Sequence, residues 1–291
     1  MGKGFYVDIP VTDLTKEPKE LNKGDFFDQN RQTQLLYNEE VNILHDTGNW
    51  CLVEALEQLS FRQKGYWAPY VGWVRKDHLR WSEGRLCFDG IVSSPQLRIG
   101  ETFFLLGTKV VKKSILDKKR KVNGIEGVIS PLSKKTVSLV KREDIVNTAK
   151  LFIGCPYLWG GRSIKYIETE KMGILTGVDC SGFVNLVFRV NGLDIPRDAH
   201  EQFMVSKKIK GEELKGGDLI FVSNKNNPGL INHVMIYCGY GKYIEASSKE
   251  GKVREGLLKE RYDSEIFLPI KRVDTGDSLL FFGRILKEEN G

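Results

Sequence analysis

The sequence has no apolar run that approaches the roughly 20 residues of a membrane-spanning helix. Its first residues, Met1 to Phe5, also lack the apolar core of a signal peptide. We therefore expect no membrane span. The expected location is cytoplasmic for the sequence as written, and exported if a leader has been removed from it.

Patterns typical of a disulfide framework or a zinc site are missing as well. The five cysteines are an odd number, and none belongs to a Cys-x-x-Cys pair. The four histidines do not cluster with cysteines or carboxylates at the spacing of metal ligands. We expect neither a metal nor a cofactor.

Neither sign of charge dominates the sequence. The 44 lysines and arginines exceed the 38 aspartates and glutamates by a net charge of +6, and most are dispersed. One basic concentration, residues 109–121, predicts a solvated hairpin tip, with a contact to an acidic polymer as the alternative. We do not expect nucleic acid as a partner, and nothing in the sequence indicates an oligomeric state.

Short strand patterns fill the first half of the sequence. Segments 34–37, 40–44, 50–56 and 70–74 are separated by turn residues such as those at 46–49. The segment 48–53 and the glycine-tryptophan-valine step at 72–74 resemble the bacterial SH3-like domain. This resemblance predicts a small all-β barrel over residues 1–83. Strand spacing predicts a second, more weakly marked barrel over residues 84–140.

From residue 141 onwards the pattern changes to helices followed by strands. Ile145, Ala149 and Phe152 recur at helical spacing, and segments such as 231–239 and 242–247 alternate like strands. Helices first and an antiparallel sheet afterwards are typical of an α+β fold. We therefore predict an α+β catalytic domain over residues 141–291.

Cys180 opens the most informative segment of this domain. A small-residue turn at 177–179 precedes it, and apolar residues follow at helical spacing from Phe183 to Phe188. A thiol at a helix N-terminus is a candidate nucleophile, because the helix dipole favours the thiolate. Most lone cysteines, however, are inert buried side chains. A nucleophile also needs a base and a group that orients the base.

His233 and Glu245 supply those two groups in the expected order. His233 lies on a strand that alternates, and Glu245 lies on the next strand, beyond a tight turn at 239–241. A thiol on a helix, then an imidazole and a carboxylate on neighbouring strands, matches the requirements of acyl transfer. The residues alone therefore predict a nucleophile, a base and an orienting group.

Five motifs, in this order along the chain, resemble those of the NlpC-type cysteine peptidases. These papain-like enzymes hydrolyse peptidoglycan stem peptides, so the resemblance implies a cysteine protease that degrades or recycles cell-wall peptides. The motifs are Pro156-Tyr157-Leu158-Trp159-Gly160-Gly161, Asp179-Cys180-Ser181-Gly182-Phe183-Val184, Pro196-Arg197-Asp198-Ala199, Gly216-Gly217-Asp218-Leu219-Ile220-Phe221 and Asn232-His233-Val234-Met235-Ile236-Tyr237.

The resemblance implies a role for each matching catalytic residue. Cys180 would be the nucleophile and His233 the general base. Glu245 stands where the family commonly has His, sometimes Asn or Gln, so it would orient the imidazole as a carboxylate or act only as a structural salt-bridge partner. The Cys180 backbone N–H, assisted by the Tyr157 hydroxyl, would stabilise the oxyanion.

Further positions match residues that line the substrate site in relatives. Asp179, Ser181, Arg197 and Asp198 would hold the D-glutamyl part of the substrate, although Arg197 and Asp198 are equally compatible with a mutual structural ion pair. The segment 164–176 lengthens the loop before the cysteine beyond the usual family spacing.

The order of the predicted domains resembles the SH3-like-domain-containing γ-D-glutamyl-L-diamino-acid endopeptidases. This resemblance implies hydrolysis of the bond between D-γ-glutamate and a diamino acid, diaminopimelate or lysine, in stem peptides with a free N-terminal L-alanine. Tyr70 matches the barrel tyrosine that recognises the α-amine, with ordinary barrel packing as the alternative. The alternative functions are another acyl-transfer or amidase activity on the same scaffold, and a catalytically inert cell-wall-binding protein.

Overall fold

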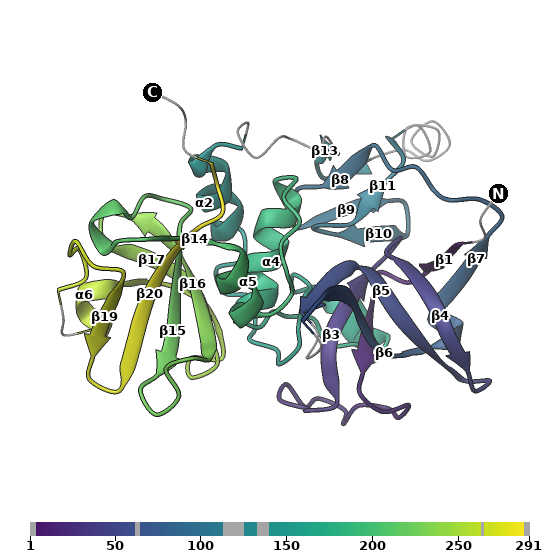
Figure 1. Ribbon diagram of the computed structural model, residues 1–291. Coiled ribbons are helices and arrows are strands. Elements are labelled where there is room, and N and C mark those ends of the chain that lie inside the picture. The colour runs from purple at the N-terminus through teal and green to yellow at the C-terminus, as the bar shows by residue number, and fades with distance from the viewer. Residues whose placement is uncertain (1–3, 62–64, 113–124, 133–139, 263–264, 288–291) are drawn as a thin grey trace. The chain divides into compact units, whose positions relative to one another are not determined.

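The computed structural model describes residues 4–61, 65–112, 125–132, 140–262 and 265–287. The chain forms two compact units (Figure 1). The N-terminal unit comprises Met1–Ser133 and Leu158–Val178, and the C-terminal unit comprises Lys134–Tyr157 and Asp179–Gly291. The chain therefore passes from one unit to the other three times.

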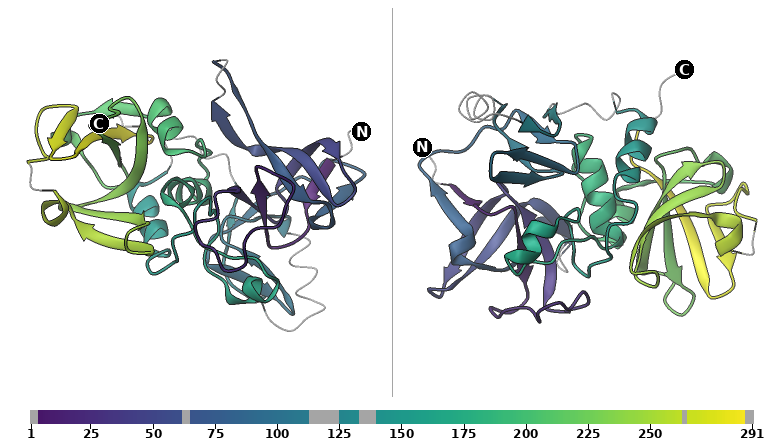
Figure 2. Two further views of the ribbon diagram at one scale, coloured as in Figure 1. Left: turned by 90° about the horizontal axis from the view of Figure 1, so that it is seen from below. Right: turned by 180° about the vertical axis from the view of Figure 1, so that it is seen from behind.

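A seven-stranded sheet, in the order β3-β2-β6-β5-β4-β1-β7, dominates the N-terminal unit. Its pairs are antiparallel, and β5 and β6 run together as a long hairpin (Figure 2). Each strand from β1 to β6 contributes side chains to one buried apolar cluster, as period-2 alternation requires. The bounds are β1 Gly4–Val7, β2 Val11–Thr15, β3 Arg31–Leu36, β4 Glu40–Asp46, β5 Trp50–Phe61, β6 Trp67–Arg75, η1 Lys76–His78 and β7 Leu79–Ser82.

Two three-stranded sheets follow, in the orders β10-β9-β12 and β11-β8-β13. The described part of this region is all-β, as the sequence predicts, whereas the SH3-like character stays a prediction. Most of the basic concentration at 109–121 lies outside the described residues. The bounds are β8 Gly90–Val92, β9 Gln96–Ile99, β10 Thr102–Leu105, β11 Lys109–Val110, β12 Ile125–Glu126 and β13 Ile129–Pro131.

The segment 158–178, which contains α3 (Ile167–Lys171), belongs to the N-terminal unit although it lies within the predicted catalytic domain in sequence. Buried polar contacts explain this assignment. The Arg162 guanidinium donates to Glu39 at 2.7 Å, with both side chains at most 2% exposed. The Gln34 side-chain oxygen accepts from the Ser163 hydroxyl at 2.7 Å. The lengthened loop at 164–176 is thus part of this unit, while the predicted domain boundaries at 83 and 140 stay predictions.

The C-terminal unit is built on a sheet in the order β14-β20-β15-β16-β17-β18, with β19 paired to β20. Helix α4 packs on β16 and β17, α5 packs on β16, and α2 packs on α4 (Figure 1). The bounds are α2 Arg142–Lys150, α4 Cys180–Val190, α5 Ala199–Val205, β14 Lys207–Ile209, η3 Gly211–Glu213, β15 Leu219–Asn224, β16 Ile231–Gly239, β17 Lys242–Ser247, β18 Lys252–Leu257, α6 Leu258–Arg261, β19 Arg272–Thr275 and β20 Ser278–Arg284.

The β16–β17 hairpin fixes the register that matters for the site. Its tight turn is confirmed: Gly239, Tyr240 and Gly241 all have positive φ, at 94°, 52° and 73°. Strand β16 is buried on both faces, since Val234 and Met235 are each fully buried. Such burial gives the strand a rigid position in the unit. Within the described residues, no helix is long and apolar enough to span a bilayer.

Candidate active site

Cys180 is the first residue of α4, as the sequence predicts. Asp179 caps this helix, because its side-chain Oδ1 accepts the Gly182 backbone N–H at 2.6 Å. The helix is apolar on nearly all sides and is buried from Ser181 to Val190. The sulfur is thus presented from a firmly packed helix start, and Cys180 itself is only partly buried.

His233 projects from β16 and lies within hydrogen-bond reach of Cys180. Its Nε2 is 2.6 Å from Oε2 of Glu245, which leaves Nδ1 as the ring nitrogen for the sulfur. Because Ile236 pairs with Ile244 across the hairpin, Glu245 lies opposite the residue two positions after His233. The imidazole and the carboxylate are therefore diagonal neighbours on one face of the sheet.

Glu245 is fully buried and has two arginine partners that the sequence analysis did not identify. Its Oε1 accepts from Arg254 Nε at 3.1 Å and from Arg261 Nη1, while its Oε2 faces His233. The hydroxyl of Tyr243 accepts from both guanidinium groups, at 3.2 and 3.4 Å. The one indication of these arginines in the sequence was Glu245 itself, since a buried glutamate requires a cationic partner.

The protonation states of this pair follow from its contacts. Burial acts to lower the pKa of His233, but hydrogen bonds with the Cys180 thiolate and the Glu245 carboxylate outweigh it and raise that pKa to about 9. Burial acts to raise the pKa of Glu245, but the hydrogen bonds from His233 and Arg261 prevail and lower it to about 2. At neutral pH the arrangement therefore holds an imidazolium beside an ionised carboxylate.

Tyr157 lies beside the sulfur as a protonated phenol. Burial first, and then the negative charges of Cys180 and Asp179, raise the pKa of Tyr157 well above its ordinary value. Its backbone N–H donates to the Gly251 carbonyl at 2.8 Å, which ties the residue to the loop before β18. A phenol that keeps its proton can donate a hydrogen bond to an anion formed at Cys180.

Arg197 is fully buried and is held mainly by Asp179. Its two terminal nitrogens donate to the two Asp179 oxygens at 3.0 and 2.7 Å, and Nη1 also donates to the Ser181 hydroxyl at 2.9 Å. The Asp198 carboxylate is farther away, at 3.9 Å, and its side chain is 43% exposed. The strong ion pair of Arg197 is therefore with the helix cap, and the mutual Arg197–Asp198 pair is a minor contact.

Tyr70 belongs to the other unit. It lies in β6 of the N-terminal unit and packs, partly buried, against the apolar cluster of the seven-stranded sheet. Its role in recognising an amine stays a prediction. No group of three histidine, cysteine, aspartate or glutamate side chains suited to a metal ion occurs among the residues that the structure describes.

A thiol at a helix start, an adjacent imidazolium and a carboxylate hydrogen-bonded to it are typical of cysteine hydrolases that work through a thioester. The sequence model of the NlpC/P60 family matches residues 154–272 of this chain. The chain is 32% identical to the gamma-D-glutamyl-L-lysine dipeptidyl-peptidase of Bacillus subtilis (strain 168) over 249 residues, which is 81% of this chain and 79% of that protein. The chain belongs to the NlpC/P60 family and is a cysteine peptidase.

One further relative agrees with this assignment, and one solved structure shares the fold. A Bacillus cereus (strain ATCC 10987 / NRS 248) protein, also named gamma-D-glutamyl-L-lysine dipeptidyl-peptidase, is 33% identical over 133 residues, which is 44% of this chain and 37% of that protein. The crystal structure of an NlpC/P60 family protein from Bacillus cereus ATCC 10987 superposes with a TM-score of 0.73 at 21% identity, covering 98% of this chain and 100% of the other. This likeness establishes the fold over nearly the whole chain. The predicted resemblance to the family is confirmed.

Proposed function

We propose that the protein hydrolyses the bond between D-γ-glutamate and a diamino acid in peptidoglycan stem peptides, with Cys180 as nucleophile and His233 as base. The observation that carries this proposal is the contact of His233 with both Cys180 and the buried Glu245. The two relatives named for gamma-D-glutamyl-L-lysine cleavage support the choice of bond.

The proposed reaction begins with attack of the Cys180 thiolate on the glutamyl carbonyl carbon. The oxyanion that forms accepts hydrogen bonds from the Cys180 backbone N–H and the Tyr157 hydroxyl. When the C–N bond breaks, the His233 imidazolium gives its proton to the departing amine. Water, deprotonated by the now neutral His233, attacks the thioester, and the C–S bond breaks to release the glutamyl carboxylic acid and restore the thiolate and the imidazolium. The released acid then loses its proton to solvent.

Glu245 would act as the orienting group, with Arg254 and Arg261 as positioning residues. The carboxylate holds Nε2 of His233, so the other ring nitrogen stays directed at the sulfur. The two guanidinium groups compensate the buried charge, which keeps Glu245 ionised and in place. A carboxylate in place of the family's usual histidine is therefore matched by cations from β18 and α6.

Substrate recognition is the finer part of the proposal. Asp198, Ser181 and the Asp179–Arg197 pair surround the start of α4 and would bind the charged groups of the D-glutamyl residue. Tyr70, on a proposed SH3-like barrel, would recognise the free amine of an N-terminal L-alanine. The segment with the greatest departure from the family spacing, 164–176, carries no proposed contact to the substrate.

The test is incubation of the full chain with L-Ala-γ-D-Glu-L-Lys and with the diaminopimelate analogue, followed by mass spectrometry of L-Ala-D-Glu. Cys180→Ala should give no product, with a loss of about 10⁴-fold or more, and Cys87→Ala is the matched control because Cys87 is an exposed thiol outside the site. Equal cleavage of an N-acetylated peptide would remove the role of Tyr70. Binding without any product in the parent protein would favour the inert wall-binding alternative.

A further inference from the structure

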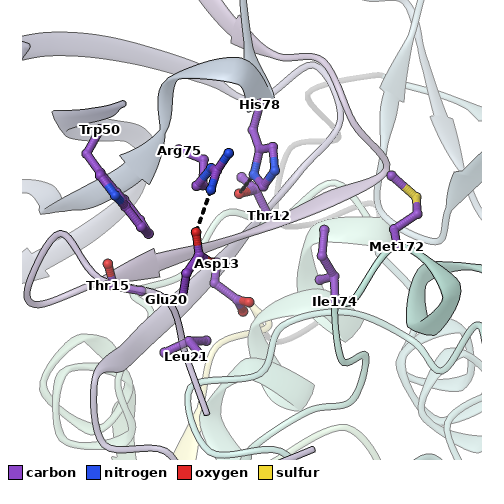
Figure 3. A pocket seen from close by; sticks show the side chains of 11 residues that line it. Thr12, Asp13, Thr15, Glu20, Leu21, Trp50, Arg75, His78, Met172 and Ile174 are labelled. Carbon is purple, nitrogen blue, oxygen red and sulfur yellow. Dashed lines mark hydrogen bonds and ion pairs between the residues drawn. The ribbon is translucent and has the colours of Figure 1, made fainter. Parts of the chain in front are cut away.

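A pocket of about 280 Å³ lies in the N-terminal unit, and no residue of the candidate active site lines it. Its walls come from β2, the loop that follows β2, β5, β6, η1 and the turn after α3 (Figure 3). A cavity of this size is near the lower end of the range for small-molecule sites. The pocket therefore holds a small ligand or one end of a longer ligand.

The inner end of the pocket is polar and carries one incompletely used carboxylate. Asp13 accepts from Arg31 Nε at 2.8 Å and from Gln34 Nε2 at 3.0 Å, and both bonds go to Oδ1. Its Oδ2 has no hydrogen bond from the residues that the structure describes. The side chain is 17% exposed. An acceptor with little solvent and no protein donor gains most from a ligand that donates hydrogen bonds.

His78 contributes a neutral ring next to this carboxylate. Its Nδ1 is hydrogen-bonded to the Thr12 hydroxyl at 2.7 Å. Burial lowers the pKa of His78, against the opposing charges of Asp77, Asp13 and Glu20, and Arg75 adds to the lowering. The imidazole therefore adds no positive charge that would repel a cation.

The outer end of the pocket carries a second carboxylate. Glu20 Oε1 accepts from Arg75 Nη1 at 2.5 Å (Figure 3). Arg75 also donates to both oxygens of Asp77, at 3.0 and 2.8 Å. One guanidinium is thus shared between two carboxylates and is not available to an anionic ligand. The Glu20–Arg75–Asp77 group therefore carries one negative charge in excess, and its member Asp77 lies next to the pocket lining and not in it.

The remaining walls are largely apolar, with Thr15 and Gly173 among them. Trp50, Leu21 and Ile174 line the space between the two carboxylates, with Trp50 beside Arg75 in Figure 3. Because the charge of Asp13 is paired with Arg31, the excess negative charge lies at the mouth and the unused acceptor lies inside. A ligand that matches both must donate several hydrogen bonds, carry a positive charge and have an apolar stem.

We propose that this pocket binds a primary ammonium group on a short aliphatic chain. The ammonium group donates to Oδ2 of Asp13, and its stem lies along Trp50 and Ile174. The excess negative charge of the Glu20–Arg75–Asp77 group attracts the cation to the mouth. The site is independent of the proposed peptidase activity, because none of its residues takes part in that reaction.

The experiment follows the indole N–H signals of the full chain by NMR during titration with n-pentylamine at constant ionic strength and pH 7. Trp50→Phe assigns the signal of Trp50 among the five tryptophans. We expect a saturable shift of that signal at millimolar concentration and no comparable shift with 1-pentanol. Nα-acetyl-lysine amide, which carries the same ammonium group on a peptide-like unit, distinguishes a peptide side chain from a free amine as the source.

Glu20→Gln should weaken n-pentylamine binding about fivefold, as expected for one exposed unit charge. Glu17→Gln is the matched control, because Glu17 lies on the same loop in an exposed ion pair with Lys19 and does not line the pocket. Asp13→Asn keeps the Oδ1 acceptor for Arg31 and should abolish saturation. Equal shifts with 1-pentanol, or unchanged binding in folded Glu20→Gln and Asp13→Asn proteins, would overturn the proposal.

Discussion

Two carboxylates of the C-terminal unit are equally buried and have the same kind of partners. Asp218, just before β15, is fully buried and bonds Arg142 at 2.9 Å and Arg284 at 2.8 Å. Glu245, in β17, is fully buried and bonds one arginine of β18 and one of α6. A buried acid between two guanidinium groups is therefore not by itself the mark of a catalytic site.

The difference lies in the remaining hydrogen bonds. The second oxygen of Asp218 also accepts the Lys215 backbone N–H at 2.8 Å, so every partner is a fixed structural group. The second oxygen of Glu245 faces His233, a ring that can gain or lose a proton and whose pKa is raised to about 9. The two ion clusters thus differ in one neighbour. Glu245 contacts a histidine that can carry a reactive proton, whereas Asp218 contacts arginines and a backbone N–H.

The strongest way to break this comparison is to neutralise each acid in turn. Glu245→Gln should lower kcat by about 10²- to 10⁴-fold, because the imidazolium loses its orienting charge. Asp218→Asn should cost about 3 kcal/mol of unfolding free energy, since the buried Arg284 and the partly exposed Arg142 lose their counter-charge, and leave kcat of the folded fraction nearly unchanged. Peptide cleavage assays and urea unfolding of both variants check this. Equal losses of kcat in the two variants would contradict it.

Acid unfolding distinguishes the contribution of Glu245 from the rest of the fold. Its pKa is about 2 in the folded protein against an ordinary 4.5, so its ionised form stabilises the protein above pH 4.5. That contribution is lost as the pH falls through about 2 and amounts to about 3 kcal/mol. Between pH 5 and pH 2 the parent should therefore lose more unfolding free energy than Glu245→Gln. Unfolding by denaturant at a series of pH values measures this. An equal loss of unfolding free energy in the parent and in Glu245→Gln would contradict the prediction.

The arginine partners sharpen the comparison through the pH dependence of activity. Removing positive charge beside the pair in Arg261→Gln should raise the pKa of His233 above its value of about 9. The alkaline limb of the kcat/KM profile should then move to higher pH, with a drop of about tenfold in kcat. Arg142→Gln is the matched control, since the two side chains are 26% and 28% exposed. A control profile that shifts equally would exclude a specific role for Arg261.

The smallest expected effect on kcat comes from the hydrogen bonds between the Tyr243 hydroxyl and the two arginines beside Glu245. Arg142 and Arg284 donate to backbone carbonyls, whereas both arginines of Glu245 donate to the Tyr243 hydroxyl. Tyr243→Phe should keep the packing of the ring and lower kcat by about threefold, because each lost bond is worth about 1 kcal/mol or less. Steady-state kinetics measures this effect. A loss as large as that of Glu245→Gln would show that the hydroxyl has a direct part in the reaction.

The sequence was sufficient to bring Cys180, His233 and Glu245 together and to give the order of the elements around them. Their catalytic roles stay a proposal. Cys180 could be placed at a helix start from local composition, and His233 and Glu245 could be paired because a tight turn joins their strands. Arg254 and Arg261 could not be found in this way. Their register with Glu245 depends on a strand pairing and a short helix whose positions are set by tertiary packing.

The grouping of segment 158–178 with the N-terminal unit was likewise not predictable, for a related physical reason. Its motif Leu158-Trp159-Gly160-Gly161 is continuous with catalytic-domain motifs, so the sequence places it in the catalytic domain. Its tertiary partners, Glu39 and Gln34, lie more than a hundred residues earlier. Local patterns carry no information on such distant polar contacts, and the contacts determine which unit the segment joins.

The buried Arg162–Glu39 pair has a consequence for any attempt to divide this protein. A fragment cut at residue 140 would separate Arg162 from Glu39, with which it forms a buried ion pair. Each half would then lack one member of that pair. This pair also constrains the exchange of the N-terminal portion during evolution. A replacement would need a carboxylate at the position of Glu39, next to Arg162.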